Sequence, residues 1–131
     1  MSERASGTFD VDLTPVSAAD EGPGFFGRMR IDKQFSGDLS GASEGLMLAV
    51  RTGIEGSAGY VAMEKVTGSL AGRAGTFVLQ HDGLMARGAP DLQIRVVPDS
   101  GTGDLTGLTG SMSIEIEDGR HFYVLEYDLP G

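Results

Sequence analysis

A five-residue pattern, Gly-x-Leu-x-Gly, occurs three times in this chain and constrains its fold more than any other feature. The copies begin at Gly37, Gly68 and Gly103, so they lie 31 and 35 residues apart. Glycine adopts positive φ without steric penalty, as tight turns and bulges require, and the central leucine can cover the end of a hydrophobic interior. This spacing fits one β-hairpin per copy. The repeat therefore predicts a fold built from consecutive hairpins.

The alternation of apolar and polar residues predicts where the strands lie. Alternation with a period of two is typical of a strand with one buried face. We expect strands near residues 7–13, 25–35, 45–51, 59–67, 75–82, 92–97, 111–117 and 121–127, with a surface loop at 16–24. Residues 45–51 are apolar on both faces, which suits a strand covered on each side or a short core helix.

A two-residue turn at Ala71-Gly72 defines the register of the central hairpin. It would place Glu64 opposite Leu79 and Ala62 opposite His81. On this register six side chains share one face, namely Tyr60, Glu64, Val66, Phe77, Leu79 and His81.

The strongest turn signal in the chain is Asp118-Gly119, because a type I′ hairpin needs two residues that tolerate positive φ. This turn predicts that Ile116 pairs with His121, Ile114 with Tyr123 and Met112 with Leu125. We expect these side chains to face the interior together with Tyr127.

Eight strands with short connections and no convincing helix indicate an all-β fold. We predict a single domain over residues 1–131, folded as an eight-stranded antiparallel up-and-down β-barrel. A two-sheet sandwich is the alternative. The barrel is preferred because eight strands close around an interior that side chains fill or that holds one small ligand, and because closure removes exposed strand edges.

Composition argues against several classes of protein. The net charge of -9 and the absence of a basic stripe oppose nucleic-acid binding. The chain has no cysteine, and therefore no disulfide or thiolate site. No segment approaches the ~20 apolar residues of a membrane span, and the first residues do not resemble a secretory signal. We expect a cytoplasmic protein with neither a membrane nor a nucleic-acid partner.

Five segments of the sequence carry a resemblance to a known family. They are YVAME at residues 60–64, TGSLAGR at 67–73, GTFVLQH at 75–81, SGTGDLTG at 100–107 and YVLEY at 123–127. The combination resembles the bacterial family known as domain of unknown function 3224 (DUF3224), which is similar in fold to the allene oxide cyclase barrel. The resemblance implies an eight-stranded barrel that forms a homo-oligomer and has no established activity. Allene oxide cyclases bind a lipophilic epoxide in the barrel and steer its cyclisation, but no residue here matches their active site by motif.

Candidate site residues gather on the predicted inner face. Glu64 and His81 are the candidate catalytic pair, because an apolar cavity raises the pKa of a carboxyl group and a neighbouring imidazole can relay a proton. The alternative is a structural network in which both side chains satisfy each other inside the core. The candidate ligand-binding residues are Tyr60, Phe77, Leu79, His121, Tyr123 and Tyr127.

No metal site or cofactor is predicted. Two histidines and a carboxylate could form a three-ligand site, but His81 and His121 are 40 residues apart and neither has a second ligand nearby in sequence.

Three functions follow from these features. The leading one is binding of a small, largely apolar molecule in the barrel, which requires a cavity of about 300 Å³. Its polar end would be oriented by Tyr60, Glu64, His81 and Tyr123. One alternative is a cofactor-free isomerase or cyclase in which Glu64 or His81 moves a proton. Another is a self-associating scaffold, suggested by Phe122 and Val124 on the expected outer face.

Overall fold

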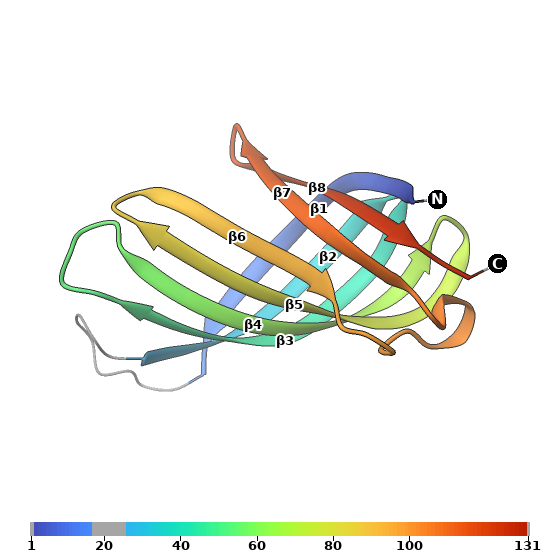
Figure 1. Cartoon of the computed structure of the whole chain (residues 1–131), viewed down its shortest axis with the longest axis horizontal. Coiled ribbons are helices and arrows are strands. Elements are labelled where there is room, and N and C mark those ends of the chain that lie inside the picture. Colours follow the sequence, from blue (N-terminus) through green and yellow to red (C-terminus); the bar gives the residue numbers. More distant parts are fainter. Residues whose placement is uncertain (1, 17–25, 131) are drawn as a thin grey trace.

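The computed structural model describes residues 2–16 and 26–130, which form a closed antiparallel β-barrel of eight strands (Figure 1). Each strand pairs with its neighbours in sequence, and β8 closes the barrel by pairing with β1. The predicted barrel is thus confirmed, and the sandwich is excluded. The strands are β1 (Glu3–Pro15), β2 (Phe26–Gly37), β3 (Leu39–Arg51), β4 (Ala58–Leu70), β5 (Arg73–Ala86), β6 (Ala89–Val96), β7 (Thr109–Glu117) and β8 (Arg120–Asp128).

Both predicted hairpin registers are confirmed. The turn residues Ala71 and Gly72 have φ of 50° and 86°, and Asp118 and Gly119 have φ of 52° and 78°. The β4–β5 and β7–β8 ladders carry the predicted cross-strand pairs. Most strands are longer than predicted, because they continue into small residues such as those at 39–44, where apolar and polar residues do not alternate clearly. The loop expected at 16–24 lies outside the described residues apart from Val16.

The three Gly-x-Leu-x-Gly copies lie at one end of the barrel, which we call the corner end. Leu39 begins β3 and Leu70 ends β4, while Leu105 lies in a 3-10 helix (Gly103–Leu105) that connects β6 to β7. All three leucines are fully buried and belong to the hydrophobic core. The prediction that each leucine closes the interior is confirmed, but the third copy lies in the 3-10 connection between β6 and β7 and not in a tight hairpin turn.

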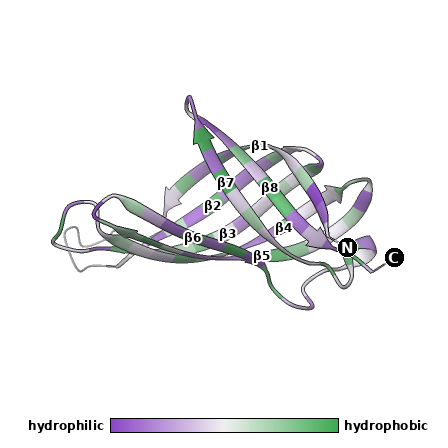
Figure 2. Ribbon diagram, turned by 45° about the horizontal axis from the view of Figure 1, so that its top comes forward, coloured by the Kyte–Doolittle hydropathy of each residue, from purple (hydrophilic) through white to green (hydrophobic). Residues whose placement is uncertain are grey.

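Apolar and polar residues alternate along the strands, so most of the apolar side chains point into the barrel and form its core. Hydrophobic and hydrophilic residues follow each other along individual strands (Figure 2). The largest buried apolar side chains in the described residues include Phe9, Phe35, Phe77, Leu79, Tyr123 and Leu125. The described part of the chain contains no helix of the length and apolarity that a membrane crossing needs.

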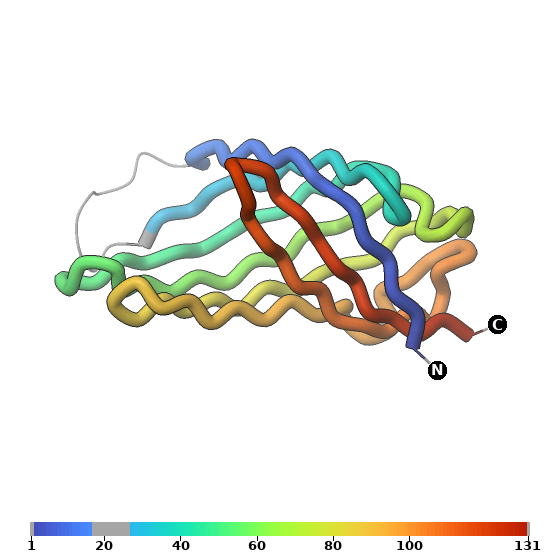
Figure 3. The backbone as a smooth tube through the Cα atoms, turned by 90° about the horizontal axis from the view of Figure 1, so that it is seen from above, coloured from blue at the N-terminus to red at the C-terminus, as the bar shows by residue number. Residues whose placement is uncertain are grey.

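The ladder between β6 and β7 is much shorter than the others. Ile94 pairs with Met112 and Arg95 with Ser111, and these pairs are the whole ladder. Beyond them the β7–β8 hairpin turns away, and β2 to β6 continue past it (Figure 3). The prediction that Ile116 faces the interior is therefore wrong, since this side chain is 67% exposed near the hairpin tip. The barrel is sealed at the corner end and splayed at the opposite end, which we call the open end.

Candidate functional site

Four polar side chains meet inside the barrel and form what we call the charged cluster. They are Lys33 from β2, Ser43 from β3, Glu64 from β4 and His81 from β5, and all are buried. Lys33 Nζ donates to Glu64 Oε1 at 2.9 Å, and Ser43 Oγ donates to Glu64 Oε2 at 2.5 Å. His81 Nε2 lies 2.5 Å from Glu64 Oε1. Glu64 is therefore the centre of the cluster.

The backbone places Glu64 close against strand β3. Its cross-strand neighbour there is Gly45. A Cβ atom at Gly45 would lie 2.2 Å from the carbonyl oxygen of Met63 and 2.7 Å from Glu64 Cα. Because glycine has no Cβ, the two strands approach closely at this point.

The cluster keeps Glu64 ionised. Burial alone would raise the pKa of this carboxyl group, but the hydrogen bond from His81 opposes that effect, as do the positive charge of Lys33 and the hydrogen bonds from Ser43 and Lys33. The net result lowers the pKa of Glu64 from 4.5 to about 2. The expectation of a raised pKa is therefore wrong. It considered desolvation without the cation that accompanies the carboxylate into the core.

Lys33 is the site residue that the sequence analysis missed. Its Nζ lies 4.7 Å from the centroid of the Phe9 ring and 5.8 Å from that of Phe35, so aromatic faces complement the ammonium group on its apolar side. The signal was present in the alternation of β2. Position 33 alternates in step with Met29, Ile31 and Phe35, the apolar residues of this strand, and so falls on the same face as they do.

The low pKa of Glu64 predicts acid sensitivity. As pH falls from about 4.5 toward 2, the unfolded chain binds a proton at Glu64 while the folded chain does not, so the free energy of unfolding should fall with pH. A pKa shift from 4.5 to about 2 corresponds to about 3 kcal/mol. Urea denaturation of wild type and Glu64→Gln between pH 7 and 2 measures this contribution. The stability difference should be constant above pH 5 and shrink below it, whereas a constant difference across the range would contradict the assignment.

A hollow of about 350 Å³ occupies the inner face at the open end of the barrel. Its lining includes Met47, Ala49, Tyr60, Gly83, Met85 and Leu92. The ring of Tyr60 covers Gly83, where a Cβ atom would overlap it. Tyr60 lies two residues before Ala62, the cross-strand partner of His81, so the hollow is one inward-facing row from the charged cluster.

Tyr60 contributes a hydroxyl group to the hollow, whose lining also includes the charged residues Arg51 and Asp91. Burial raises the pKa of its hydroxyl, and the carboxylates of Glu64 and Asp82 raise it further. The hydroxyl therefore keeps its proton at neutral pH and can donate a hydrogen bond to a bound acceptor.

The family model described as "Protein of unknown function (DUF3224)" matches residues 5–127. The chain belongs to the DUF3224 family. It is also similar to the crystal structure of a protein of unknown function from this family in Shewanella oneidensis MR-1. The two share 49% sequence identity and a TM-score of 0.93, and the similarity covers 100% of this chain and 99% of the other. No curated protein matches the chain. The family resemblance drawn from five sequence segments is confirmed, while similarity to allene oxide cyclase stays an expectation.

Four of the candidate ligand-binding residues of this DUF3224 barrel lie in its packed core: Phe77, Leu79, Tyr123 and Tyr127. The hydroxyl of Tyr123 accepts a hydrogen bond from Leu39 N at 2.9 Å and faces the carbonyl oxygens of Ser36 and Leu39 at 3.0 and 3.1 Å. It thereby ties β8 to the first glycine corner. None of the four lines the hollow at the open end.

His121 is separate from the charged cluster. Its ring packs on Phe9 with 5.0 Å between centroids. It lines a different hollow of about 200 Å³ together with Thr8, Asp10 and Arg120. Among the residues that the structure describes, no three histidine or acidic side chains are arranged to hold a metal ion. The structure thus brings Glu64 and His81 together, with Tyr60 in the adjacent row, and leaves His121 elsewhere.

Proposed function

We propose that this DUF3224 protein binds a small, largely apolar molecule in the hollow at the open end of the barrel. The observation that carries the proposal is the hollow itself. Its volume of about 350 Å³ falls in the range of about 300–1,000 Å³ typical of ligand pockets, and its walls are mainly apolar. Met47 and Met85 give the walls flexible side chains, which suit ligands of varied shape.

The polar end of the molecule would meet Tyr60. A protonated hydroxyl in a mainly apolar wall favours a hydrogen-bond acceptor such as a carbonyl oxygen. Burial raises the pKa of Tyr60, and the ionised Glu64 of the adjacent charged cluster adds to this effect, so the hydroxyl is a hydrogen-bond donor. The short β6–β7 ladder leaves the side of the open end free for entry.

The chemistry of Glu64 favours binding over proton transfer. A carboxylate whose pKa is about 2 carries no proton to give at neutral pH, and it is a weak base. Both of its oxygens already accept hydrogen bonds from the cluster. These contacts support a role in stability and electrostatics, and weigh against the isomerase alternative.

Ala49→Phe is expected to weaken ligand binding by at least about tenfold, because the added ring occupies the hollow. Titration with Nile red, a neutral apolar dye, provides the measurement, and thermal unfolding verifies that the barrel remains folded. Ala74→Phe is the matched control, since it adds the same ring at an exposed, outward-facing position of β5 near the corner end, away from the hollow. Dye affinity that is unchanged by Ala49→Phe would contradict the proposal.

A further inference from the structure

The outer face of β3, β4 and β5 carries a continuous apolar surface, which we call the outer patch. It consists of Leu46, Leu48, Val61, Met63 and Leu84, each between 41% and 61% exposed. Leu46 pairs with Met63 and Leu48 with Val61, so these side chains form adjacent rows. A groove of about 470 Å³ runs along them. Contiguous exposed apolar surface of this kind is typical of interaction sites.

The sequence of β3 shows that this face is built to be covered. Residues 45–51 are apolar on both faces, a pattern expected for a strand that is covered on each side. The inward side chains Met47 and Ala49 line the hollow of the barrel. The outward side chains Leu46 and Leu48 remain 61% and 41% exposed in the described chain.

Charged residues border the outer patch in a self-complementary order. One row across the sheet reads Arg28, Leu48, Val61 and Asp82, with a cation at one edge and a carboxylate at the other. Arg28 and Asp82 are exposed, and neither makes an ion pair with another described residue.

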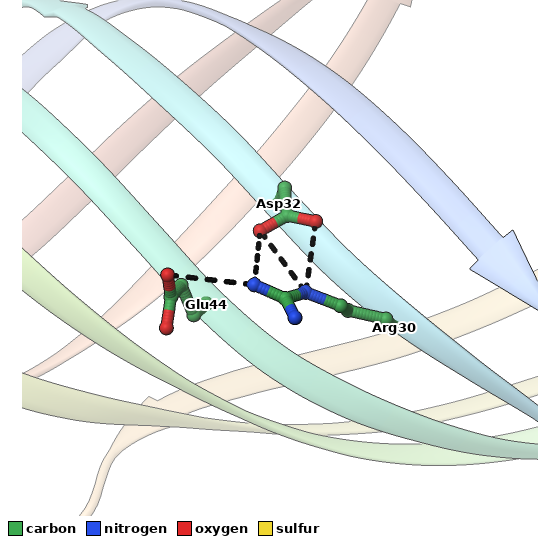
Figure 4. A network of polar contacts seen from close by, with 3 residues as sticks. All are labelled: Arg30, Asp32 and Glu44. Atoms are coloured by element: carbon green, nitrogen blue, oxygen red, sulfur yellow. Dashed lines mark hydrogen bonds and ion pairs between the residues drawn. The ribbon is translucent and has the colours of Figure 1, made fainter. Parts of the chain in front are cut away.

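A second charged row borders the patch toward the corner end. There Glu44 on β3 faces Lys65 on β4, and both are exposed. The guanidinium of Arg30 is already engaged by Asp32 and Glu44 of the same chain (Figure 4). Arg28 makes no such contact within the described part of the chain and is therefore available to an outside carboxylate.

We propose that the outer patch binds a second copy of this chain about a two-fold axis that runs parallel to the strands, between β3 and β4. This axis lays β3 of one copy over β4 of the other, so that Leu48 meets Val61 and Leu46 meets Met63. It also brings Arg28 against Asp82 and Glu44 against Lys65 of the second copy. Both charged contacts join opposite signs, which makes the face complementary to itself.

The order of the charged residues across the sheet distinguishes this axis from a two-fold axis perpendicular to the strands. A two-fold axis perpendicular to the strands, along the row that contains Arg28, would lay each strand over its own counterpart. Arg28 would then meet Arg28, and Asp82 would meet Asp82. Like charges placed in contact across an interface cost several kcal/mol, so the observed order favours the parallel axis. Aligned strands are also a common geometry for two sheets packed face to face.

Sedimentation velocity at micromolar concentration tests the surface. We expect a wild-type dimer, and we expect Met63→Glu to raise its dissociation constant about 100-fold, because a two-fold interface contains the new charge twice and each copy costs about tenfold. Ile116→Glu is the matched control, as it places the same charge on a comparably exposed residue of β7 and should leave the dimer intact. A monomeric wild type, or a dimer that survives Met63→Glu, would overturn the proposal.

Charge reversal tests the axis. Arg28→Asp alone sets carboxylates against each other across the dimer, and Asp82→Arg alone does the same with guanidinium groups, so each homodimer should weaken at least about tenfold. A mixture of the two variants restores opposite charges at both contacts. Native mass spectrometry should then find mainly heterodimers. An Arg28→Asp homodimer as tight as the wild type, as the perpendicular axis would give, or a statistical distribution of homodimers and heterodimers would rule out the parallel two-fold arrangement.

Discussion

Glu64→Gln is expected to lower the free energy of unfolding by about 3–5 kcal/mol, because it leaves the buried ammonium of Lys33 without a counter-charge. Urea denaturation at pH 7 measures the loss. The double variant Lys33→Met/Glu64→Gln removes both charges and should regain at least half of the lost free energy of unfolding. Replacing both members of a buried ion pair by uncharged side chains often changes stability little. A double variant that is less stable than Glu64→Gln would show that an unpaired Lys33 ammonium is not the cause of the loss in Glu64→Gln.

Glu126→Gln provides the matched control for this substitution. Glu126 pairs with Arg4 at 2.8 Å on the barrel surface, where both side chains are more than half exposed. The loss of an exposed ion pair should change stability by less than about 1 kcal/mol. Equal effects at the two positions would contradict a special role for burial at Glu64.

Leu105→Ala is expected to destabilise the barrel by about 2–5 kcal/mol, the range for a buried leucine whose loss leaves a cavity. Leu105 is fully buried at the corner end, where the 3-10 helix connects β6 to β7. Thermal and urea unfolding measure the effect. The control is Leu13→Ala on β1, because Leu13 is 48% exposed and should lose less than about 1 kcal/mol. Similar losses at the two positions would mean that the corner leucine does not seal the interior.

Local sequence signals were sufficient to predict the hairpins of this fold. Asp118-Gly119 and Ala71-Gly72 each specify a two-residue turn, and a turn of known length sets the register of the strands that it joins. The same argument gave the wrong position for Ile116. Ile116 alternates in step with the inward-facing residues of β7, but the register of the β7–β8 hairpin does not reveal where β7 stops pairing with β6.

The candidate site was harder to predict than the fold. Glu64 and His81 were expected to meet, because one ladder places both on the inner face. Lys33 comes from β2, which does not pair with β4, and its contact with Glu64 reaches over β3, where Ser43 and Gly45 lie between them. The pKa of Glu64 therefore moves in the direction opposite to the expected one.

Local sequence patterns were enough to specify the strands, the hairpin registers and the sealed corner end, because turn residues and period-two alternation act over a few neighbouring positions. Three other features could be recognised only in the folded barrel: the ionised cluster in its interior, the opening between β6 and β7, and the exposure of the patch on β3 to β5. These features depend on how far each ladder extends and on which side chains of non-adjacent strands come into contact. Both properties arise only when the sheet curls and closes.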